Sequence, residues 1–587
     1  MNASSHVFGV TRSILGQPWR WRGGPADGLQ LTDIETQLYF SRGCPAHELE
    51  RHRAPTIRTW MPDPSIFRDM ETGARRIADA VQAGENIVVF GDYDVDGATS
   101  AALMIRVLRA LGASAGYYIP DRLMEGYGPS AEALVRLGQN GARLIVTVDC
   151  GAQAFEALAA AKEAGVDVVV VDHHQCSTAL PPAVALINPN RLDEEEGAAH
   201  GHLAAVGVAF LLSAAVVREM RTRGAFRTRA EPNLLELLDI VALGTVADVV
   251  ALKGLNRAFV AQGLKVMANR RNTGLAALMD AARLTKPPSA TDLGFALGPR
   301  INAGGRVGKS DLGVRLLTTE DPDEAALIAE ELNRLNEERR ALEALVLEQA
   351  EAAAAHTANA SVSVVAGKCW HPGVIGIVAG RLKERLGKPA IVIGVDDAGV
   401  GKGSGRSIPG VDLGSAVIAA RESGLVQAGG GHAMAAGLTV AEDKVPALAD
   451  FLEGRLAEGV ARAREVAALV LDCAVAPRGV SVELAETLEA AGPYGSGWPN
   501  PRVAAGPFGI VSCDIVGQGH VRAILAGQDG GRLKGVAFRH AETQLGAALL
   551  AARGRKLFVA GRVKRDDWGA RPQAEMHIED AAWADRG

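Results

Sequence analysis

The sequence predicts an α/β protein with a parallel-sheet domain, a long connecting helix, a second α/β domain and a C-terminal β-barrel. Apolar runs alternate with helical stretches from residue 85 to residue 174, the pattern of parallel strands joined by helices. Residues 321–356 have apolar side chains at helical spacing and charged side chains elsewhere, which is typical of one long helix. From about residue 465, short strands with turn signals replace the helices and favour a small barrel.

The composition is that of an ordinary globular protein. The chain has 587 residues, of which 48% are hydrophobic and 22% charged, so several domains are expected. The net charge of −6 gives no overall attraction to nucleic acid, and any such binding must come from local basic patches. The six cysteines form no CxxC pairs, which argues against a zinc ribbon or a disulfide framework and predicts a cytoplasmic protein. The sequence has no signal-peptide core and no apolar run of ~18 residues, so no membrane span is expected.

Three predicted parallel strands each end in carboxylate or imidazole side chains. The strands are the apolar runs in "ENIVVFGDYD", "ARLIVTVDCG" and "VDVVVVDHH". Because ligands of such sheets bind at the carboxyl ends of the strands, we expect these side chains to face one site. A further segment, "LLELLDIVALGTVADVVAL", is helical in its first part and adds an acid just after a Gly-Thr turn. The side chains concerned are Asp92, Asp94, Asp96, Asp149, Asp172, His173, His174 and Asp248.

These groups predict a site for divalent cations. Like charges that lie close together raise one another's pKa unless a positive charge sits among them. Carboxylates and neutral imidazoles are ligands of hard to borderline cations, and a set without thiolates favours Mn²⁺ or Mg²⁺, although histidine also suits zinc. Two such ions about 3.5–4 Å apart, sharing a bridging carboxylate, are the usual apparatus for phosphoryl hydrolysis.

Each of these residues also has a simpler interpretation. A single Asp after a strand is most often a helix N-cap, and a single His pair is usually a surface feature. We expect Asp92 in such a supporting role, since alternation along the chain makes it a weaker ligand candidate than Asp94 and Asp96. The metal site is favoured because four separate segments place acids or histidines at strand ends or on an adjacent turn.

Motifs over nearly the whole chain resemble those of the DHH phosphoesterases, and the full layout is similar to that of the RecJ single-strand-specific exonucleases. "DYDVDG", "VTVDCG", "VVDHHQ" and "GTVADVV" look like the four DHH motifs. "PDRLMEGYG", "LGPRINAGGRVG", "LNRLNEERR", "WHPGVIGIVAGRL" and "GSGRS" look like further RecJ segments, and "AGGGHAMAAG" resembles the signature of the DHH-associated domain. Two departures are Gly304, where Ala is commoner, and Ala251, where Pro is more usual.

The resemblance implies a division of the chain and a role for each strand-end residue. Asp149 is the expected bridge between the ions, His174 is expected to contact the scissile phosphate, and Asp92 and Asp172 are expected to support the ligands. The implied metal ligands are Asp94, Asp96, Asp149, His173 and Asp248. The implied divisions are an N-terminal extension (1–75), a DHH catalytic domain (76–320), a connecting helix (321–358), a DHH-associated domain (359–462) and an OB-fold nucleic-acid-binding domain (463–587).

Candidate phosphate-binding residues come from five segments of the sequence, around residues 122–127, 300–306, 404–406, 430–432 and 534–568. The glycine-rich stretches "GSGRS" and "GGGH" are predicted as loops whose backbone N–H groups approach a phosphate, although a tight turn is the simpler interpretation of such a stretch taken alone. Basic residues are interleaved with aromatic ones in the barrel, as in OB-folds that bind single strands, although a solvated basic face explains them equally. There Phe538, Trp568 and Trp498 are candidates for stacking on bases. The candidates are Arg122, Tyr127, Arg300, Asn302, Arg306, Ser404, Arg406, Gly430, Gly431, His432, Lys534, Arg562, Lys564 and Trp568.

The resemblance implies a single-stranded-DNA-specific 5′→3′ exonuclease that releases 5′-mononucleotides, uses two Mn²⁺ or Mg²⁺ ions and serves DNA recombination and repair. His174, Asp149 and Arg406 are its expected catalytic residues. Single-stranded DNA is the expected substrate, single-strand-binding protein and a helicase are expected partners, and a monomer is expected. The spacing of the acids alone supports only metal-dependent phosphoester hydrolysis.

Two alternatives stay open. One is a hydrolase of short oligoribonucleotides or cyclic dinucleotides, against which the extra barrel and N-terminal extension count, because a small substrate needs no long track. The other is a non-catalytic, replication-associated scaffold that has lost its ions. Every ligand position is filled in this sequence, which argues against the scaffold.

Overall fold

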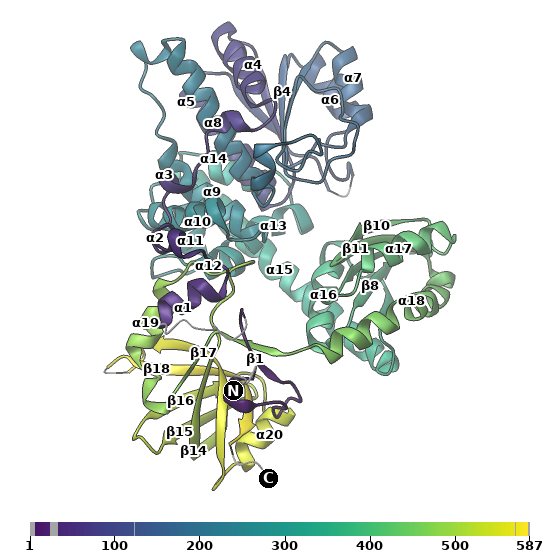
Figure 1. Cartoon of the computed structure of the whole chain (residues 1–587). Helices are drawn as coiled ribbons and strands as arrows, with labels where there is room; N and C mark the ends of the chain where they lie inside the picture. The colour runs from purple at the N-terminus through teal and green to yellow at the C-terminus, as the bar shows by residue number, and fades with distance from the viewer. Residues whose placement is uncertain (1–5, 24–32, 123, 570, 585–587) are drawn as a thin grey trace.

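The computed structural model describes residues 6–23, 33–122, 124–569 and 571–584. Figure 1 shows three regions: a large α/β region, a smaller α/β region beside it, and a β-rich region that holds both ends of the chain. Residues 1–5 of the expected N-terminal extension, and Leu123 in "PDRLMEGYG", lie outside the described residues. Within the described ranges, no helix is both long and apolar enough to cross a membrane.

The large region is built on a five-stranded parallel sheet with strand order β3-β2-β4-β5-β6. Alternate residues of β2 face opposite sides, where Ile87 and Val89 pack with α4, α5 and α8, and Val88 and Phe90 pack with α6 and α7. Figure 1 shows these helices on the two faces, which explains the continuous apolar runs of the strands. The strands are β2 (Ile87–Gly91), β3 (Ala115–Tyr118), β4 (Leu144–Val148), β5 (Asp167–Val171) and β6 (Ala185–Ile187), and the helices are α4 (Met70–Ala83), α5 (Val95–Ala110), α6 (Ala131–Gln139), α7 (Phe155–Glu163) and α8 (Ala205–Thr222).

A helical layer follows, and one prediction about it is wrong. Gly244 and Thr245 do not form a turn but lie inside α9. A Cβ on Gly244 would lie 2.2 Å from Oγ1 of Thr99 on α5, so glycine is needed there for close helix packing. The long helix predicted from the spacing is α15, which leads to the second α/β region. The helices are α9 (Leu238–Ala247), α10 (Gly254–Ala268), α11 (Thr273–Ala281), α12 (Ala290–Asp292), a π-helical turn (Leu293–Leu297), α13 (Gly298–Val307), α14 (Leu312–Thr318) and α15 (Pro322–Ala354).

The second α/β region has a mixed sheet with strand order β10-β11-β9-β8-β7. The glycine-rich stretches predicted as loops are in fact strands β9 and β10. A Cβ on Gly405 would lie 2.7 Å from the side chain of Leu413, so this glycine lets a leucine cover the sheet. The strands are β7 (Ser363–Lys368), β8 (Ala390–Val395), β9 (Val400–Arg406), β10 (Ala428–His432) and β11 (Ala435–Ala441), and the helices are α16 (Pro372–Leu386), α17 (Leu413–Glu422) and α18 (Val445–Glu465).

The C-terminal region is a closed barrel, because β14 pairs with both β15 and β17. The short parallel strand β13 adds to β14, and two helices cover the barrel. With this barrel, the fold class predicted from the sequence is confirmed. The elements are β12 (Leu469–Leu471), β13 (Cys473–Val475), α19 (Val482–Ala490), β14 (Val503–Val516), β15 (His520–Gly527), β16 (Arg532–Ala537), α20 (Gln544–Ala551), β17 (Lys556–Asp566) and β18 (Gln573–Trp583).

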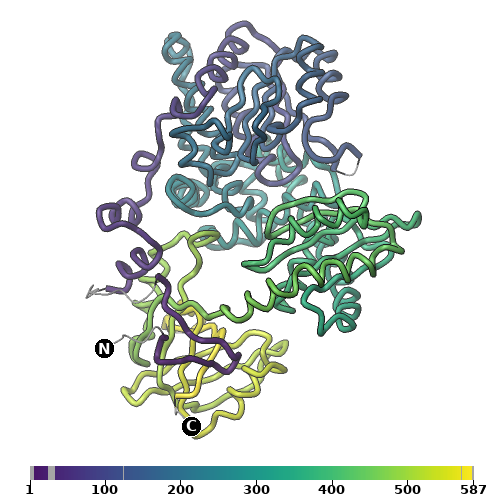
Figure 2. Tube along the Cα trace, turned by 45° about the vertical axis from the view of Figure 1, so that its right-hand side comes forward, coloured from purple at the N-terminus to yellow at the C-terminus, as the bar shows by residue number. Residues whose placement is uncertain are grey.

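The N-terminal segment packs on this barrel rather than standing apart. Strand β1 pairs in parallel with β12, and the indole nitrogen of Trp19 donates to Oδ2 of Asp580 at 3.0 Å. Figure 2 shows the purple N-terminal tube running beside the yellow barrel. The first and last parts of the sequence therefore share a core, and the domain limits stay a prediction. The N-terminal elements are β1 (Trp19–Trp21), α1 (Ile34–Ser41), α2 (Leu49–Arg53) and α3 (Ile57–Trp60).

Candidate metal centre and phosphate-binding residues

The polar side chains at the strand ends meet, as the sequence predicts. Their ligand atoms form three sets, within each of which all atoms lie within 4.8 Å of one another. Asp149 and His173 each belong to two sets, so the sets share members, as two ions with a bridging ligand require. The sets are Asp149, His173 and His174; Asp96, His173 and Asp248; and Asp92, Asp94 and Asp149. The last set includes Asp92, which the sequence indicated only as a supporting residue.

Two of the acids are held by helix N-termini. Asp94 is the N-cap of α5, and its Oδ1 accepts the backbone N–H of Gly97 at 3.0 Å. The Asp96 carboxylate accepts the N–H groups of Ala205 at 2.7 Å and Val206 at 2.9 Å, in the first turn of α8. A helix N-terminus favours a carboxylate through its free N–H groups and its dipole. These bonds fix both carboxylates in place before any cation binds.

Asp149 has an unusual backbone. Its φ is +60°, a left-handed conformation that non-glycine residues adopt rarely and often at functional sites. Its amide donates to the carbonyl of Val171 at the end of β5, and its own carbonyl accepts the hydroxyl of Tyr127 at 3.0 Å. These two contacts hold the strained conformation between the ends of two strands.

The carboxylates lack partners that balance their charge. Oδ1 of Asp92, Oδ1 of Asp149 and Oδ2 of Asp248 are buried without a hydrogen-bond partner among the described residues, which costs free energy if nothing binds them. Burial, with the charge of Asp94, raises the pKa of Asp92 and of Asp96 to about 7. Burial, with the charge of Asp96, raises the pKa of Asp248 to about 9 and that of Asp149 well above its ordinary value.

A pair of divalent cations fits this donor set. Cations would give the buried carboxylate oxygens a partner and remove the repulsion that raises these pKa values. Nδ1 of His173 lies 3.0 Å from the carbonyl of Leu203, while its Nε2 lies 3.3 Å from Oδ1 of Asp149. Burial and the nearby His174 lower the pKa of His173, so this imidazole is neutral, the form that binds a metal.

His174 has the opposite environment. Its Nδ1 lies 2.7 Å from Oδ1 of Asp172. Burial opposes the charged imidazole, but the hydrogen bond to Asp172 outweighs it and raises the pKa of His174. Burial also opposes ionisation of Asp172, but its hydrogen bonds, first the one with His174, lower the pKa of Asp172. The fixed carboxylate of Asp172 therefore favours the protonated form of His174.

Tyr127 and Arg122 come from the segment between β3 and α6. The hydroxyl of Tyr127 lies 3.3 Å from Nδ1 of His174 and donates to the Asp149 carbonyl, so it joins two strand ends. The guanidinium of Arg122 lies 5.1 Å from the centre of the Tyr93 ring. Tyr93 stands between Asp92 and Asp94 in the sequence. Both predicted phosphate-binding residues therefore lie beside the acidic cluster.

Arg406 is a cation without a carboxylate partner in the described part of the chain. Its Nη1 donates to Oγ of Ser404 at 3.0 Å and to the carbonyl of Gly405 at 2.8 Å, and burial alone lowers its pKa. Strand β9 lies between β8 and β11, so its backbone groups are used in the sheet, and its side chains are the donors available to a phosphate. Gly430, Gly431 and His432 lie on β10, an edge strand with one side unpaired.

Arg300 and Arg306, the two candidate arginines on α13, already donate hydrogen bonds to other groups of the protein. Nη1 of Arg306 donates to the carbonyl of Gly373 at 2.9 Å and joins α13 to α16. Burial, with the charge of Arg122, lowers the pKa of Arg306 to about 10. Arg300 donates to Oδ1 of Asn333 at 3.0 Å. The structure thus places Arg306 at the contact between the two α/β regions. Asn302, which lies between Arg300 and Arg306 in the sequence, is half-buried on α13.

The basic residues of the barrel that are predicted to bind nucleic acid differ in how far nearby carboxylates neutralise their charge. Lys534 is bound by Asp566 at 2.9 Å and Glu575 at 2.6 Å, and Arg562 is paired with Glu579. Lys564 has no ion pair among the described residues, and Trp568 is 98% exposed. Trp498 is only 4% exposed, so the expectation that it stacks on bases is wrong.

Three rings gather on the barrel, and the sequence predicts only one of them, Phe538, as a stacking residue. The rings of His520 and His577 lie 5.2 Å and 4.8 Å from the ring of Phe538, each in an edge-to-face arrangement. Phe538 was predicted as a stacking residue, and the structure leaves it exposed. The two histidines are far apart in sequence, and only the pairing of strands brings them together.

Comparisons with known proteins agree with this architecture. Models of the "DHH family, N-terminal domain", the "DHHA1 domain" and the "RecJ OB domain" match residues 86–245, 358–458 and 471–580. The single-stranded-DNA-specific exonuclease RecJ of Escherichia coli K12 is 38% identical over 524 residues, which cover 87% of this chain and 89% of that protein. The chain belongs to the RecJ family.

Other RecJ proteins support the assignment. RecJ of Bacillus subtilis is 33% identical, over 94% of this chain and 68% of that protein. The crystal structure of RecJ from Thermus thermophilus in complex with Mn²⁺ superposes with a TM-score of 0.76 at 29% identity, and the match covers 93% of this chain and 75% of that one. A complex of the same protein with Mg²⁺ gives a TM-score of 0.70.

Proposed function

We propose that this RecJ-family protein is a metal-dependent exonuclease that degrades single-stranded DNA from its 5′ end and releases 5′-mononucleotides. The observation that carries the proposal is the cluster of three overlapping ligand sets, which share Asp149 and His173 and contain buried oxygens without partners. Relatives that resemble the chain over most of its length are named single-stranded-DNA-specific exonucleases. Such an enzyme serves DNA recombination and repair.

Asp94, Asp96, Asp149, His173 and Asp248 would hold two Mn²⁺ or Mg²⁺ ions, with Asp149 between them and Asp92 beside them. When bound, the ions supply an activated water and neutralise charge on the phosphate. The donor set consists of oxygen and imidazole ligands, which suits these cations. That RecJ of Thermus thermophilus binds both ions supports the choice.

The protein's own residues bind and orient the phosphate. Because Asp172 occupies Nδ1 of His174, the imidazolium has Nε2 available to donate to an oxygen of the scissile phosphate. In this role His174 stabilises the charge that develops on that oxygen. Tyr127, in contact with the ring of His174, holds it in place.

The polarity of degradation rests on Arg406 and Ser404. A half-buried guanidinium that meets no carboxylate in the part of the chain that the structure describes is suited to forked bonds to a terminal phosphate. The α16 helix limits the space around it, since a Cβ on Gly376 would lie 3.1 Å from Nη2 of Arg406. We assign this pair to the 5′ end of the strand, with Arg122, Arg300, Asn302, Arg306 and the β10 residues Gly430, Gly431 and His432 along the adjoining backbone.

The rest of the strand would lie on the barrel. Lys564 offers a charge without an ion pair across the described ranges, and Phe538 and Trp568 offer exposed rings, the features of single-strand platforms. Lys534 and Arg562 would contribute less, because carboxylates already neutralise them. A monomer in the cytoplasm that works with single-strand-binding protein and a helicase is the context we propose.

A digestion time course tests the proposal. Oligonucleotides labelled at the 5′ or the 3′ end, with and without a terminal duplex block, are incubated with the protein and Mn²⁺. We expect the 5′ label to appear first as a mononucleotide, and a 5′ duplex to block the reaction. Release from the 3′ end first, or faster turnover of a dinucleotide than of a long strand, would contradict the proposal.

A matched variant identifies the site. Asp149→Asn keeps the size of the side chain, and asparagine adopts the left-handed backbone more readily than alanine does. The exchange therefore removes the charge with little change in conformation. We expect activity to fall by more than about a hundredfold, and a variant that still degrades the strand would exclude Asp149 as the bridge.

A further inference from the structure

The segment that joins α19 to the barrel docks on the helical layer of the catalytic domain. Figures 1 and 2 show this yellow-green segment extending from the barrel toward α10 and α12. Arg257 on α10 is 1% exposed and donates to the carbonyls of Pro493, Ala491 and Gly492 at 2.8–2.9 Å. Its guanidinium also lies 4.4 Å from the centre of the Trp498 ring. One buried cation thus binds three consecutive carbonyls of the docking segment, residues 491–498.

The docking segment makes a second contact with the catalytic domain at residues 251 and 252, a few residues before Arg257. The amide of Leu252 donates to the carbonyl of Ser496 at 2.8 Å, and the Leu252 side chain is buried in the same core as the barrel. Gly497 has a φ of +68°, and a Cβ there would lie 2.8 Å from Cβ of Ala251. The docking segment therefore meets residues 251 and 252 at van der Waals distance, with no space for a further methyl group.

These contacts lie next to the ligand Asp248. Oδ2 of Asp248 is buried without a hydrogen-bond partner among the described residues, whereas Asp94 and Asp96 are held by backbone N–H groups. The following residue, Val249, has a φ of +63°, which is strained for a β-branched residue. The position of the Asp248 carboxylate thus depends on a strained turn between the end of α9 and the docked residues 251 and 252.

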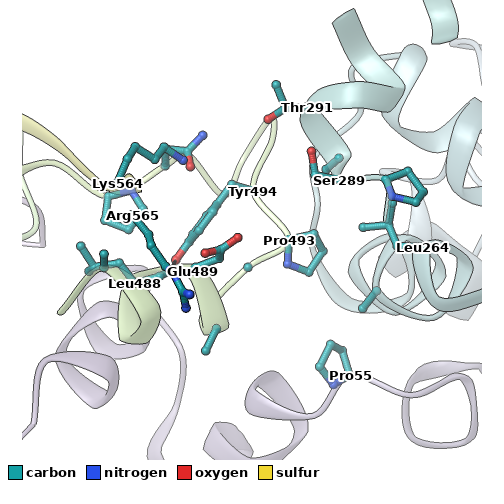
Figure 3. Close-up of a pocket in the computed structure, with 18 of the residues that line it drawn as sticks. Pro55, Leu264, Ser289, Thr291, Leu488, Glu489, Pro493, Tyr494, Lys564 and Arg565 are labelled. Atoms are coloured by element: carbon teal, nitrogen blue, oxygen red, sulfur yellow. Dashed lines mark hydrogen bonds between the residues drawn. The ribbon is translucent and has the colours of Figure 1, made fainter. Parts of the chain in front are cut away.

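A cavity lies beside the docking segment. Figure 3 shows this cavity, with Pro493 and Tyr494 between Lys564 and Arg565 of the barrel and Leu264 and Ser289 of the catalytic domain. The cavity has a volume of about 710 Å³ and separates the two regions on that side. The docking segment therefore links the barrel directly to the turn that carries Asp248.

We propose that the barrel positions a metal ligand: the docking segment 491–498 holds the turn after Asp248, and Arg257, Leu252 and Gly497 are positioning residues for that carboxylate. The inference rests on the proposed metal centre. It predicts that a disturbance in the barrel linker changes metal affinity, although no residue of the linker contacts the ion.

Gly497→Ala tests the inference in the full-length chain. The new methyl group meets Ala251 and should displace the turn, so we expect Mn²⁺ affinity, measured by calorimetry and by electron paramagnetic resonance, to fall roughly tenfold. The control is Gly530→Ala, because Gly530 also lies in the C-terminal region with a φ of +81° but has nothing within 4 Å of its Cβ position. It carries the same backbone strain, and its Mn²⁺ affinity should stay within about twofold of wild type.

A rescue variant separates contact from strain. Ala251→Gly in the Gly497→Ala background removes the methyl group that the new side chain meets, so Mn²⁺ affinity should return toward wild type. If Gly497→Ala does not fold, Arg257→Lys takes its place, since a single ammonium on a shorter side chain cannot reproduce the contacts that two guanidinium nitrogens make with the three carbonyls.

The outcomes distinguish this inference from the proposed function. A wild-type protein that binds no Mn²⁺ overturns the metal centre and the inference with it. A wild-type protein that binds Mn²⁺, with Gly497→Ala and Gly530→Ala equal in affinity, overturns the inference alone. A loss confined to Gly497→Ala, restored by Ala251→Gly, supports it.

Discussion

Nδ1 of His174 lies 2.7 Å from Oδ1 of Asp172, and the same carboxylate accepts the backbone N–H groups of Ala152, His173 and His174. Four bonds to one buried group fix both the tautomer and the direction of the His174 ring. We therefore expect Asp172 to act on the reaction through His174 rather than as a metal ligand.

Asp172→Asn should lower kcat about 10- to 100-fold. The carboxylate raises the pKa of His174, so the amide should lower it. Because the protonated imidazole is the proposed phosphate donor, the alkaline limb of the pH profile of kcat should move to lower pH. A uniform loss at all pH values would contradict this role. Asp193→Asn, at a carboxylate paired with Arg191, is a control that should leave the profile unchanged.

Binding of Mn²⁺ should depend on pH. In the metal-free protein the pKa values of Asp92 and Asp96 are about 7 and that of Asp248 is about 9, so these groups hold protons near neutral pH that a cation must displace. Affinity should therefore rise between pH 6 and pH 9, with protons released on binding. Calorimetry in buffers of different ionisation enthalpy measures this release, and binding without it would be inconsistent with the pKa values.

Arg406→Lys should reduce selection for a 5′-phosphate. Lysine keeps the charge but cannot form two parallel bonds to one phosphate. We expect KM for a 5′-phosphorylated oligonucleotide to rise about tenfold and KM for a 5′-hydroxyl oligonucleotide to change little. Lys402→Ala removes an exposed charge from the same strand and serves as the control. Equal changes for the two substrates would place Arg406 elsewhere on the track.

Lys564→Ala should weaken single-strand binding more than Lys534→Ala does. Lys534 is neutralised by Asp566 and Glu575, so it releases few counterions from DNA, whereas Lys564 has no ion pair in the described residues. Loss of one phosphate contact should make the slope of log K against log salt less negative by about 0.7. Fluorescence anisotropy of a labelled strand at several salt concentrations measures both slopes, and identical slopes would contradict the assignment.

The sequence was informative where chemistry follows directly from the order of residues. Apolar runs ending in acids predict parallel strands and a shared ligand edge, and the structure brings Asp94, Asp149 and His173 together there. The sequence does not reveal the place of Gly244, because a glycine that allows close helix packing looks the same in sequence as one that forms a turn. The glycine-rich strands β9 and β10 look like loops for a similar reason, since the side chains that need the space, such as Leu413 at Gly405 and Val417 at Gly429, come from other segments.

Other features depend on contacts between distant segments. Trp498 looks like a stacking residue beside basic strands, but the guanidinium of Arg257 lies over it at the junction of two domains. Strand β1 pairs with β12, near the other end of the chain, which no local pattern predicts. Lys534 and Arg562 look like DNA contacts until the barrel places Glu575 and Glu579 beside them.

The central claim is that the carboxylates and the histidine that four segments bring together form a site for two divalent cations. Anomalous diffraction from crystals of the wild-type protein soaked in Mn²⁺ tests it most directly. We expect two peaks beside Asp149, one near Asp92 and Asp94 and one near Asp96, His173 and Asp248. No peak at this cluster, with the carboxylates still arranged as described, would contradict the claim.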